Sequence, residues 1–292
     1  MKISVITPTY NRKDTLGKLY NSILNNLQCD IEIEWLIMDD GSTDGTEEYI
    51  QKFKEEKKIC IKYYKQENQG KMKAINNLVP YADSDFLVEC DSDDYFTENA
   101  FKTIKNNCIL KKKIYAYVFL KSNEKNEIIG NEFKSNNFKS KMFDLYYKQG
   151  INGDKALVYN TKIRKQYKYK IEEGENFSTE ARLHHEIDEK YDVLCFNEIV
   201  MICKYQEDGY SKNIKNIFKK NPNGYFKFFE EMLKKDFSGV KWEKRIYIIK
   251  HYILFKYLSK QKMDLRKTSF VNKLLIFILY IPGIIKSYVK FK

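Results

Sequence analysis

An acidic cluster, Asp91-Ser92-Asp93-Asp94, directly follows the apolar run of residues 86–90. Carboxylates two positions apart on an extended segment can both face one divalent cation and the phosphates bound to it. Such oxygen ligands suit Mg²⁺ or Mn²⁺. An isolated Asp-x-Asp is often only a solvated turn, but its position after an apolar strand-like run favours a functional site.

Two further polar segments contain residue types that suit a nucleotide. Asp39-Asp40 leads into a Gly-Ser-Thr-Asp-Gly turn, and the Asp39 carboxylate is able to accept a hydrogen bond from a base N–H. An Asp-Gly turn and a helix cap explain part of this pattern. Residues 8–12 supply a backbone turn, an aromatic face that can pack beside a base, and a cation that can meet phosphate. The candidates from this segment are Pro8, Thr9, Tyr10 and Arg12.

Strand-like and helix-like patterns alternate over the first 120 residues. Short β-rich runs predict strands at residues 3–7, 31–38, 59–64, 86–90 and 116–120. Helices are predicted after an N-cap at Asp14, over 45–55, over 71–79 and from Thr97. This alternation predicts an α/β fold with a mostly parallel sheet, in which ligands bind beyond the carboxyl ends of the strands. Because the three polar segments follow the first, second and fourth strands, we expect them at one rim of the sheet.

Four segments, ISVITPTYNR, LIMDDGSTDGTEE, ENQGKMKAIN and VECDSDDYF, resemble glycosyltransferase family 2 in their order and spacing. The resemblance covers residues 1 to about 110 and implies a GT-A fold, with a Rossmann-like, mostly parallel nucleotide-binding sheet flanked by helices. It also implies an inverting, metal-dependent transfer of a sugar from a nucleotide diphosphate, UDP favoured, to a hydroxyl of a glycan or lipid-linked acceptor. The later segments EGENFSTEARLHHEIDEKY and YQEDGYS more loosely resemble members that act in capsule, lipopolysaccharide and wall-polymer synthesis.

The resemblance implies a role for individual residues. Asp39 would contact the uracil edge, Asp91 the ribose and Asp93 a Mn²⁺ or Mg²⁺ ion beside the diphosphate. Lys71 would lie near the nucleotide or its phosphates, and Ser92 would belong to the same nucleotide-binding group. The family often carries a histidine after that lysine, whereas this chain has Met72.

The catalytic base implied by the resemblance is an acidic residue in a Glu-Asp-like motif before a helix. This chain has no Glu-Asp pair there. Glu180 is our choice, because the residues after it continue as that helix does, and Glu175 is the alternative. An ordinary acidic residue in the first turn of a helix is the competing interpretation of Glu180.

The composition leaves other classes of protein to consider. With 52 Lys and Arg against 40 Asp and Glu, the net charge is +12, which favours phosphate-rich partners. A nucleotidyltransferase or a haloacid-dehalogenase-type phosphatase could use the same acidic cluster, although that phosphatase class carries its Asp-x-Asp after the first strand. A basic nucleic-acid-binding protein is the non-enzyme alternative. We expect no nucleic acid partner, because the lysines are dispersed and no nucleic-acid-binding motif is present. The six cysteines and three histidines lack metal-site spacing.

The C-terminal part has a different pattern. We expect a catalytic domain at residues 1–212, with a nucleotide-binding half at 1–110 and an acceptor-side half at 111–212, followed by a helical extension at 213–292. The apolar run at 274–285 is flanked by lysines and is too short to span a bilayer. Residues 270–292 therefore favour peripheral membrane contact, and a buried helix or a homo-oligomer contact is the alternative. Together with the lack of a signal peptide pattern, this predicts a cytoplasmic protein at the cytoplasmic face of the inner membrane.

Overall fold

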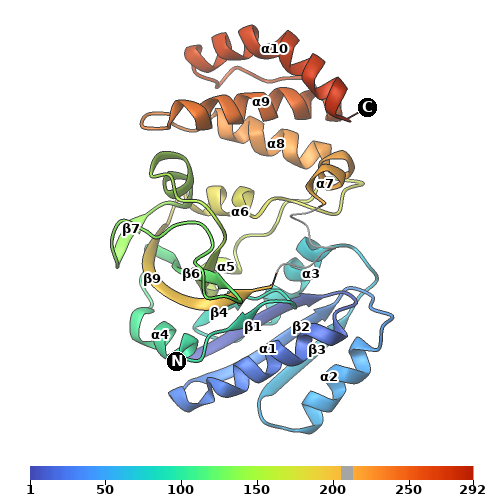
Figure 1. Cartoon of the computed structure of the whole chain (residues 1–292), viewed down its shortest axis with the longest axis vertical. Coiled ribbons are helices and arrows are strands. Elements are labelled where there is room, and N and C mark those ends of the chain that lie inside the picture. Colours follow the sequence, from blue (N-terminus) through green and yellow to red (C-terminus); the bar gives the residue numbers. More distant parts are fainter. Residues whose placement is uncertain (205–212, 292) are drawn as a thin grey trace.

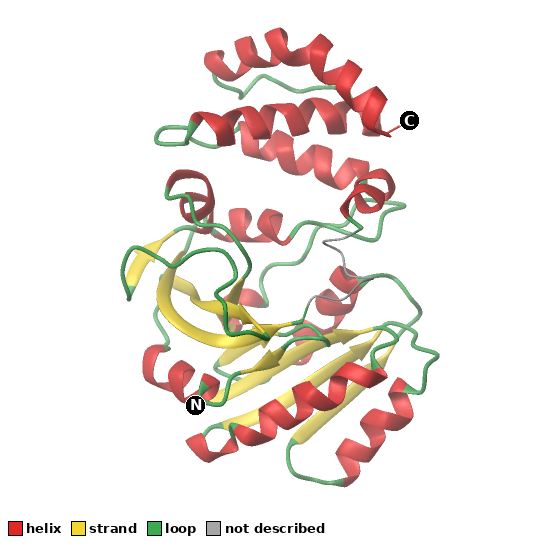
Figure 2. Ribbon diagram, in the orientation of Figure 1, coloured by secondary structure: helices red, strands yellow, loops and turns green. Residues whose placement is uncertain are grey.

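The computed structural model describes residues 1–204 and 213–291, with side chains as far as residue 285. A curled sheet forms one end of the molecule and layers of helices form the other (Figures 1 and 2). The strands are β1 (Lys2–Thr9), β2 (Glu32–Asp39), β3 (Cys60–Lys65), β4 (Phe86–Glu89), β5 (Tyr95–Phe96), β6 (Ile114–Asn123), β7 (Phe138–Ser140), β8 (Lys155–Asn160) and β9 (Asp192–Cys203). The helices are α1 (Lys13–Asn25), α2 (Thr46–Glu55), α3 (Lys71–Leu78), α4 (Ala100–Asn107), α5 (Thr161–Arg164), α6 (Glu180–Ile187), α7 (Ile214–Lys220), α8 (Pro222–Leu233), α9 (Trp242–Ser259) and α10 (Phe270–Phe291).

The first four strands form a parallel block in the order β3-β2-β1-β4. Both faces of this block are covered, which explains why β1 and β2 are buried along nearly their whole length rather than on alternate residues. The helices α1, α2 and α4 pack on one face through residues such as Leu19, Phe53 and Phe101. The helix α3 packs on the other face through Met72 and Ile75. The predicted α/β fold is confirmed.

Two predicted helix starts are displaced. The helix for which Asp14 is the expected N-cap begins at Lys13. Its N-cap is Arg12, and Asp14 lies in its first turn. The helix expected from Thr97 begins at Ala100, because Tyr95–Phe96 first pairs with β9 as a short strand.

The sheet continues beyond the parallel block through β8, which pairs antiparallel with β4 and β6. The long strand β9 then curls across the sheet and pairs with β6, β5 and β7 (Figure 1). The stretch at 121–150, which the polar sequence predicts as a loop or linker, is packed. It buries Phe133, Met142 and Leu145 against the second core and contains β7 and a single helical turn at Asp144–Lys148.

The last four helices, α7 to α10, build most of a third core, which is rich in aromatic residues such as Phe226, Phe229 and Tyr252 and also includes Phe143. The helices α8, α9 and α10 are stacked in sequence order, with α10 outermost (Figure 1). The expected C-terminal helical extension is confirmed, and the boundary at residue 212 stays a prediction. Within residues 1–204 and 213–291, no helix is both long and apolar enough to cross a membrane.

Candidate functional site

A cavity of about 880 Å³ opens beyond the carboxyl ends of β1 and β4. Residues 8–12 cover the end of β1 and the turn after it, residues 91–94 follow β4, and all of them line the cavity. Residues 70–72 at the start of α3 and Glu180 at the start of α6 complete its middle. The structure therefore brings the first and third polar segments of the sequence to one rim, together with the lysine and the glutamate of two helix starts.

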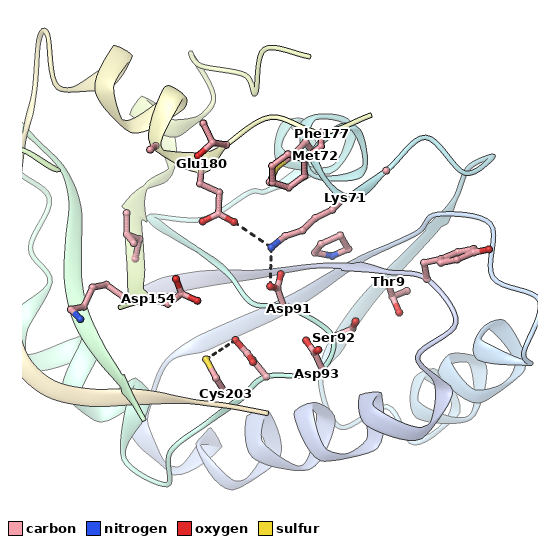
Figure 3. Close-up of a pocket in the computed structure, with 18 of the residues that line it drawn as sticks. Thr9, Lys71, Met72, Asp91, Ser92, Asp93, Asp154, Phe177, Glu180 and Cys203 are labelled. Atoms are coloured by element: carbon pink, nitrogen blue, oxygen red, sulfur yellow. Dashed lines mark hydrogen bonds and ion pairs between the residues drawn. The ribbon is translucent and has the colours of Figure 1, made fainter. Parts of the chain in front are cut away.

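Lys71 lies at the centre of this cavity, with a carboxylate on either side (Figure 3). Its Nζ donates to Asp91 Oδ2 at 2.8 Å and to Glu180 Oε1 at 3.3 Å. The three residues are far apart in the sequence and come from α3, the end of β4 and the start of α6. Their convergence is a property of the fold and not of any local motif.

The turn before α3 positions Lys71. Gly70 has a φ of 93°, and a Cβ at this residue would lie 2.5 Å from the carbonyl oxygen of Asn176, so only glycine fits. Asp40 accepts hydrogen bonds from the backbone N–H groups of Gln69 and Gly70, both at 2.8 Å. Asp40 lines the cavity, but its carboxylate is hydrogen-bonded to this turn, so Asp40 acts on the site by positioning Lys71.

The charges of this group are mutually stabilised. Burial disfavours the ammonium of Lys71, but the carboxylates of Asp91 and Glu180 outweigh it and hold the pKa of Lys71 well above its ordinary range. Burial likewise opposes the charge on Asp91, yet Lys71 and Lys121 lower its pKa. The pKa of Glu180 is lowered chiefly by Lys71. All three groups are therefore ionised at neutral pH.

Asp93 carries the least compensated charge in the cluster. Burial, followed by the nearby carboxylates of Asp91 and Asp94, raises the pKa of Asp93 from 3.8 to about 6. Asp94 is paired, since its Oδ2 lies 3.2 Å from Lys121 Nζ. A cation near Asp93 would relieve this excess of negative charge.

We expect Asp93→Asn to stabilise the metal-free protein at neutral pH. Because the folded pKa lies above the unfolded one, ionisation of Asp93 destabilises the native state, and this penalty is complete above about pH 6. One pKa unit corresponds to about 1.4 kcal/mol, and partial exposure should leave about 1–2 kcal/mol of added unfolding free energy. Thermal melts in EDTA should show a higher Tm for Asp93→Asn at neutral pH. The gain should shrink as the pH falls from about 6 towards 4. A lower Tm at neutral pH would contradict the assigned environment of Asp93.

The Asp39 side chain is not part of the cavity wall. It is fully buried, and its two oxygens accept from Ser42 N–H at 2.7 Å and from Tyr63 O–H at 2.7 Å. Its neighbour Asp40 lines the cavity instead. For Asp39 to contact a base as predicted, at least one of these hydrogen bonds would have to break.

The two candidates for the catalytic base have different surroundings. Glu180 lines the cavity, whereas Glu175 does not belong to the residues that line it. The Glu175 carboxylate is buried and accepts from the backbone N–H groups of Asn223 at 2.6 Å and Gly224 at 2.8 Å. Glu175 therefore caps the start of α8, a structural task that explains its acidic side chain.

The segment after β1 forms one wall of the cavity and is held to the turn after β2. Asn11 donates its backbone N–H to Ser42 Oγ at 2.9 Å and accepts from Thr43 N–H at 2.9 Å. These hydrogen bonds hold the backbone next to Tyr10, whose ring is half exposed. The cavity is also lined by the remaining candidates, which are Pro8, Thr9 and Arg12 in this wall and Ser92 after β4.

The family assignment follows from comparison with known proteins. The model of the family described as Glycosyl transferase family 2 matches residues 4–168, more than half of the chain. The chain belongs to glycosyl transferase family 2. The predicted family is confirmed, and the matched region contains most of β1, all of β2, β3 and β4, and the acidic cluster.

Two relatives within family 2 show how far the similarity extends. An uncharacterized glycosyltransferase of Mycoplasma genitalium, MG060, is 35% identical over 123 residues, which are 41% of this chain and 41% of the relative. The poly(ribitol-phosphate) beta-N-acetylglucosaminyltransferase TarS of Staphylococcus aureus is 31% identical over 102 residues, 35% of this chain and 18% of TarS. The matches span less than half the length of both relatives.

Solved structures confirm the GT-A fold expected for family 2. TarS residues 1–349 in complex with UDP-GlcNAc align with 99% of this chain and 89% of that chain, at a TM-score of 0.60 and 17% identity. The mannosyltransferase PcManGT of Pyrobaculum calidifontis, in complex with GDP-Man and Mn²⁺, aligns with 99% and 86%, at a TM-score of 0.58 and 14% identity. At these identities the similarity establishes the fold alone.

Met72, at the position where the resemblance to family 2 suggests a histidine, is buried and lines the cavity. No group of three or more His, Cys, Asp or Glu side chains among the described residues is arranged to hold a metal ion. The loosely matching segment YQEDGYS at residues 205–211 lies outside the described residues.

The sequence analysis missed the far half of the cavity. Tyr146, Asp154, Lys155 and His184 line it, and Asp154 is visible beside Asp91 in Figure 3. Burial lowers the pKa of Lys155 to about 8 and that of His184 to about 4, so His184 is neutral at physiological pH. The sequence signal for this half of the cavity is the glycine turn at residues 150–153, which places Asp154 directly before β8.

Proposed function

We propose that this protein transfers a sugar from a nucleotide diphosphate to a hydroxyl group of an acceptor, with the chemistry in the cavity at Lys71. The single observation that supports this most strongly is the Lys71 ammonium held between the carboxylates of Asp91 and Glu180. One cation that can neutralise a departing diphosphate thus lies beside one carboxylate that can accept an acceptor proton. Membership of family 2 supports the same reaction and disfavours the phosphatase, nucleotidyltransferase and nucleic-acid-binding alternatives.

The nucleotide is proposed to bind between the wall at residues 8–12 and the end of β4. The exposed ring of Tyr10 offers a face for the base, and Asp91 lies where a ribose hydroxyl can donate to it. UDP is the favoured nucleotide, since TarS, the structural neighbour described above, was determined with UDP-GlcNAc. Asp39 supports this wall through the turn after β2, because its carboxylate accepts from Ser42 N–H.

Asp93 is the residue proposed to hold a divalent metal ion. Its raised pKa marks a carboxylate in an excess of negative charge, and an oxygen ligand of this kind fits Mn²⁺ or Mg²⁺. These ions commonly take one or two carboxylates together with substrate phosphates, which agrees with the absence of a three-residue cluster among the described residues. When bound, such an ion supplies Lewis-acid stabilisation of charge on the leaving diphosphate.

Glu180 is proposed as the base of a single displacement. Lys71 keeps the pKa of Glu180 low, so the carboxylate is ionised before substrates arrive. When the diphosphate attracts the Lys71 ammonium, Glu180 loses part of this stabilisation and becomes a stronger proton acceptor. It then removes the acceptor hydroxyl proton as the oxygen attacks the anomeric carbon, whose configuration inverts, and Lys71 faces the charge that forms on the diphosphate.

The acceptor is proposed to occupy the far half of the cavity. The volume of about 880 Å³ lies near the upper end of the range of about 300–1,000 Å³ for small-molecule sites, so donor and acceptor can be accommodated together. Tyr146, Asp154 and neutral His184 offer hydrogen-bond partners and ring faces for a sugar. A glycan or lipid-linked glycan of capsule, lipopolysaccharide or wall-polymer synthesis is the acceptor class we propose. In this scheme residues 1–110 bind the nucleotide and residues 111–212 serve the acceptor.

A thermal-shift screen of nucleotide sugars, with and without Mn²⁺, tests this function. A ligand that binds only the folded state adds about 2.7 kcal/mol to the free energy of unfolding at a hundredfold excess over its Kd, and the Tm rises accordingly. We expect a UDP-sugar to raise the Tm in Mn²⁺ and to lose most of this effect in EDTA. Incubation of the best donor with candidate glycans should then release UDP and a glycosylated product. Release of inorganic phosphate without sugar transfer, or no response to any nucleotide sugar, would contradict the proposal.

A further inference from the structure

The outermost helix, α10, exposes a continuous apolar face. Phe277 is 82% exposed, Phe270 79% and Ile281 70%, values typical of polar surface residues rather than of large apolar ones. Leu274, Ile278 and Ile285 recur with them at helical spacing. The outer face is defined by these six residues: Phe270, Leu274, Phe277, Ile278, Ile281 and Ile285.

The opposite side of α10 is already occupied by α9. Ile276 is buried there, with Leu275, Leu279 and Ile284 packed around the same core. Gly283 permits this close approach, since a Cβ at this position would lie 2.9 Å from Ile253 Cγ2. Because α10 packs against α9 through this contact, the described part of the chain leaves the outer face uncovered.

The positive charge of α10 and the residues before it indicates which kind of partner can cover the outer face. From Leu265 to the C-terminus the sequence contains six Lys and Arg residues and no Asp or Glu. Lys267 and Lys273 are exposed close to the outer face. A second copy of the chain would bring two such basic regions together, which is unfavourable, whereas an anionic surface would attract them.

We propose that the outer face of α10 docks on an anionic lipid bilayer. The helix then lies in the plane of the interface, with its apolar side chains below the headgroups and its lysines against the anionic lipids. An in-plane arrangement agrees with the finding that no described helix has the length and apolarity to cross a membrane. The helix α10 lies at the end of the molecule, beyond α9 and α8 (Figure 1), and none of its residues lines the cavity.

Flotation of the full-length protein with lipid vesicles tests the docking. Vesicles of phosphatidylcholine with phosphatidylglycerol should bind the protein at low salt, and vesicles of phosphatidylcholine alone should bind it far less. Phe277→Glu combined with Ile281→Glu should lower the partition coefficient by at least about tenfold, because two inserted side chains become charged. Lys267→Gln combined with Lys273→Gln should lower it by about fivefold for each lysine, and only on the anionic vesicles.

A matched control uses the same chemistry elsewhere on the surface. Ile109→Glu combined with Leu110→Glu removes two exposed apolar side chains after α4 and adds the same charge. This variant should bind vesicles nearly as well as the unchanged protein, apart from the effect of its altered net charge. Phe277→Trp provides a second readout, since its fluorescence should shift to shorter wavelength on anionic vesicles, whereas Leu110→Trp should not respond.

Three results would overturn the docking. They are equal loss of binding in both glutamate pairs, no binding to anionic vesicles at low salt, and a vesicle-free dimer that Phe277→Glu with Ile281→Glu converts to a monomer. Because the vesicles carry no donor or acceptor, these results are independent of the transfer reaction. A failure of the docking would therefore be distinguishable from a failure of the proposed function.

Discussion

Glu180→Gln should abolish most sugar transfer while leaving donor binding intact. General-base assistance contributes about 10²–10⁴-fold to a reaction of this type, so kcat should fall by that factor. Glutamine has nearly the same shape and can still accept a hydrogen bond from Lys71, so the fold and the nucleotide wall are preserved. The measurements are kcat with a saturating donor and the Kd of the donor, obtained by titration calorimetry.

Glu175→Gln is the control for this experiment. Its carboxylate caps α8 and does not face the cavity, so we expect a loss of about 0.5–2 kcal/mol of stability and a normal kcat below the melting temperature. If Glu175→Gln abolished transfer and Glu180→Gln retained it, the assignment of the base would have to be exchanged.

Lys71→Met should have the second large effect. Removing a single charge-stabilising donor from an active site typically lowers kcat by about 10²–10³-fold, and Lys71 is the cavity cation beside both Asp91 and Glu180. The pH profile offers a sharper readout. Because Lys71 is the main cause of the lowered Glu180 pKa, its loss lets burial raise that pKa. The acid limb of log kcat/KM should therefore move to higher pH in Lys71→Met.

Lys73→Met is the matched control, since it removes the same charge from the same helix at a position that does not line the cavity. We expect it to keep both the rate and the acid limb of the unchanged protein. An acid limb that stays in place in Lys71→Met would show that Glu180 does not limit the reaction in the manner proposed, even if the rate fell.

The parallel half of the fold was predictable because its signals are local. The strands at residues 3–7 and 86–90 are apolar on both faces, and a polar residue follows each where the chain leaves the sheet. Once the strands are parallel, their carboxyl ends must share one rim, and this places Asp91 and Asp93 in one cavity with residues 8–12. The position of Lys71 followed from the resemblance to family 2.

The choice between neighbouring acidic residues was not predictable, because it depends on tertiary contacts. Asp39 and Asp40 are adjacent, and only the packing of Tyr63 and of the turn before α3 decides which one lines the cavity. Glu175 lies before α6 and Glu180 begins it, and only the docking of α8 identifies Glu175 as a cap.

The far half of the cavity depends on pairings that the sequence does not encode locally. Asp154 lies just before β8 and Lys121 lies near the end of β6, and these strands meet only because β8 runs antiparallel between β4 and β6. The polar stretch at 121–150 gave little sign of its three buried side chains, because Phe133 is isolated, and Met142 and Leu145, although three residues apart, lie in a run too short to indicate a helix.

The most direct test of the account is a crystal structure with UDP and Mn²⁺, in which anomalous scattering locates the metal. We predict an anomalous peak inside the cavity within about 2.5 Å of an Asp93 carboxylate oxygen, with the diphosphate beside it and the Lys71 ammonium turned towards the phosphates. A metal and diphosphate bound elsewhere on the molecule, with Asp93 and Lys71 unchanged, would contradict it.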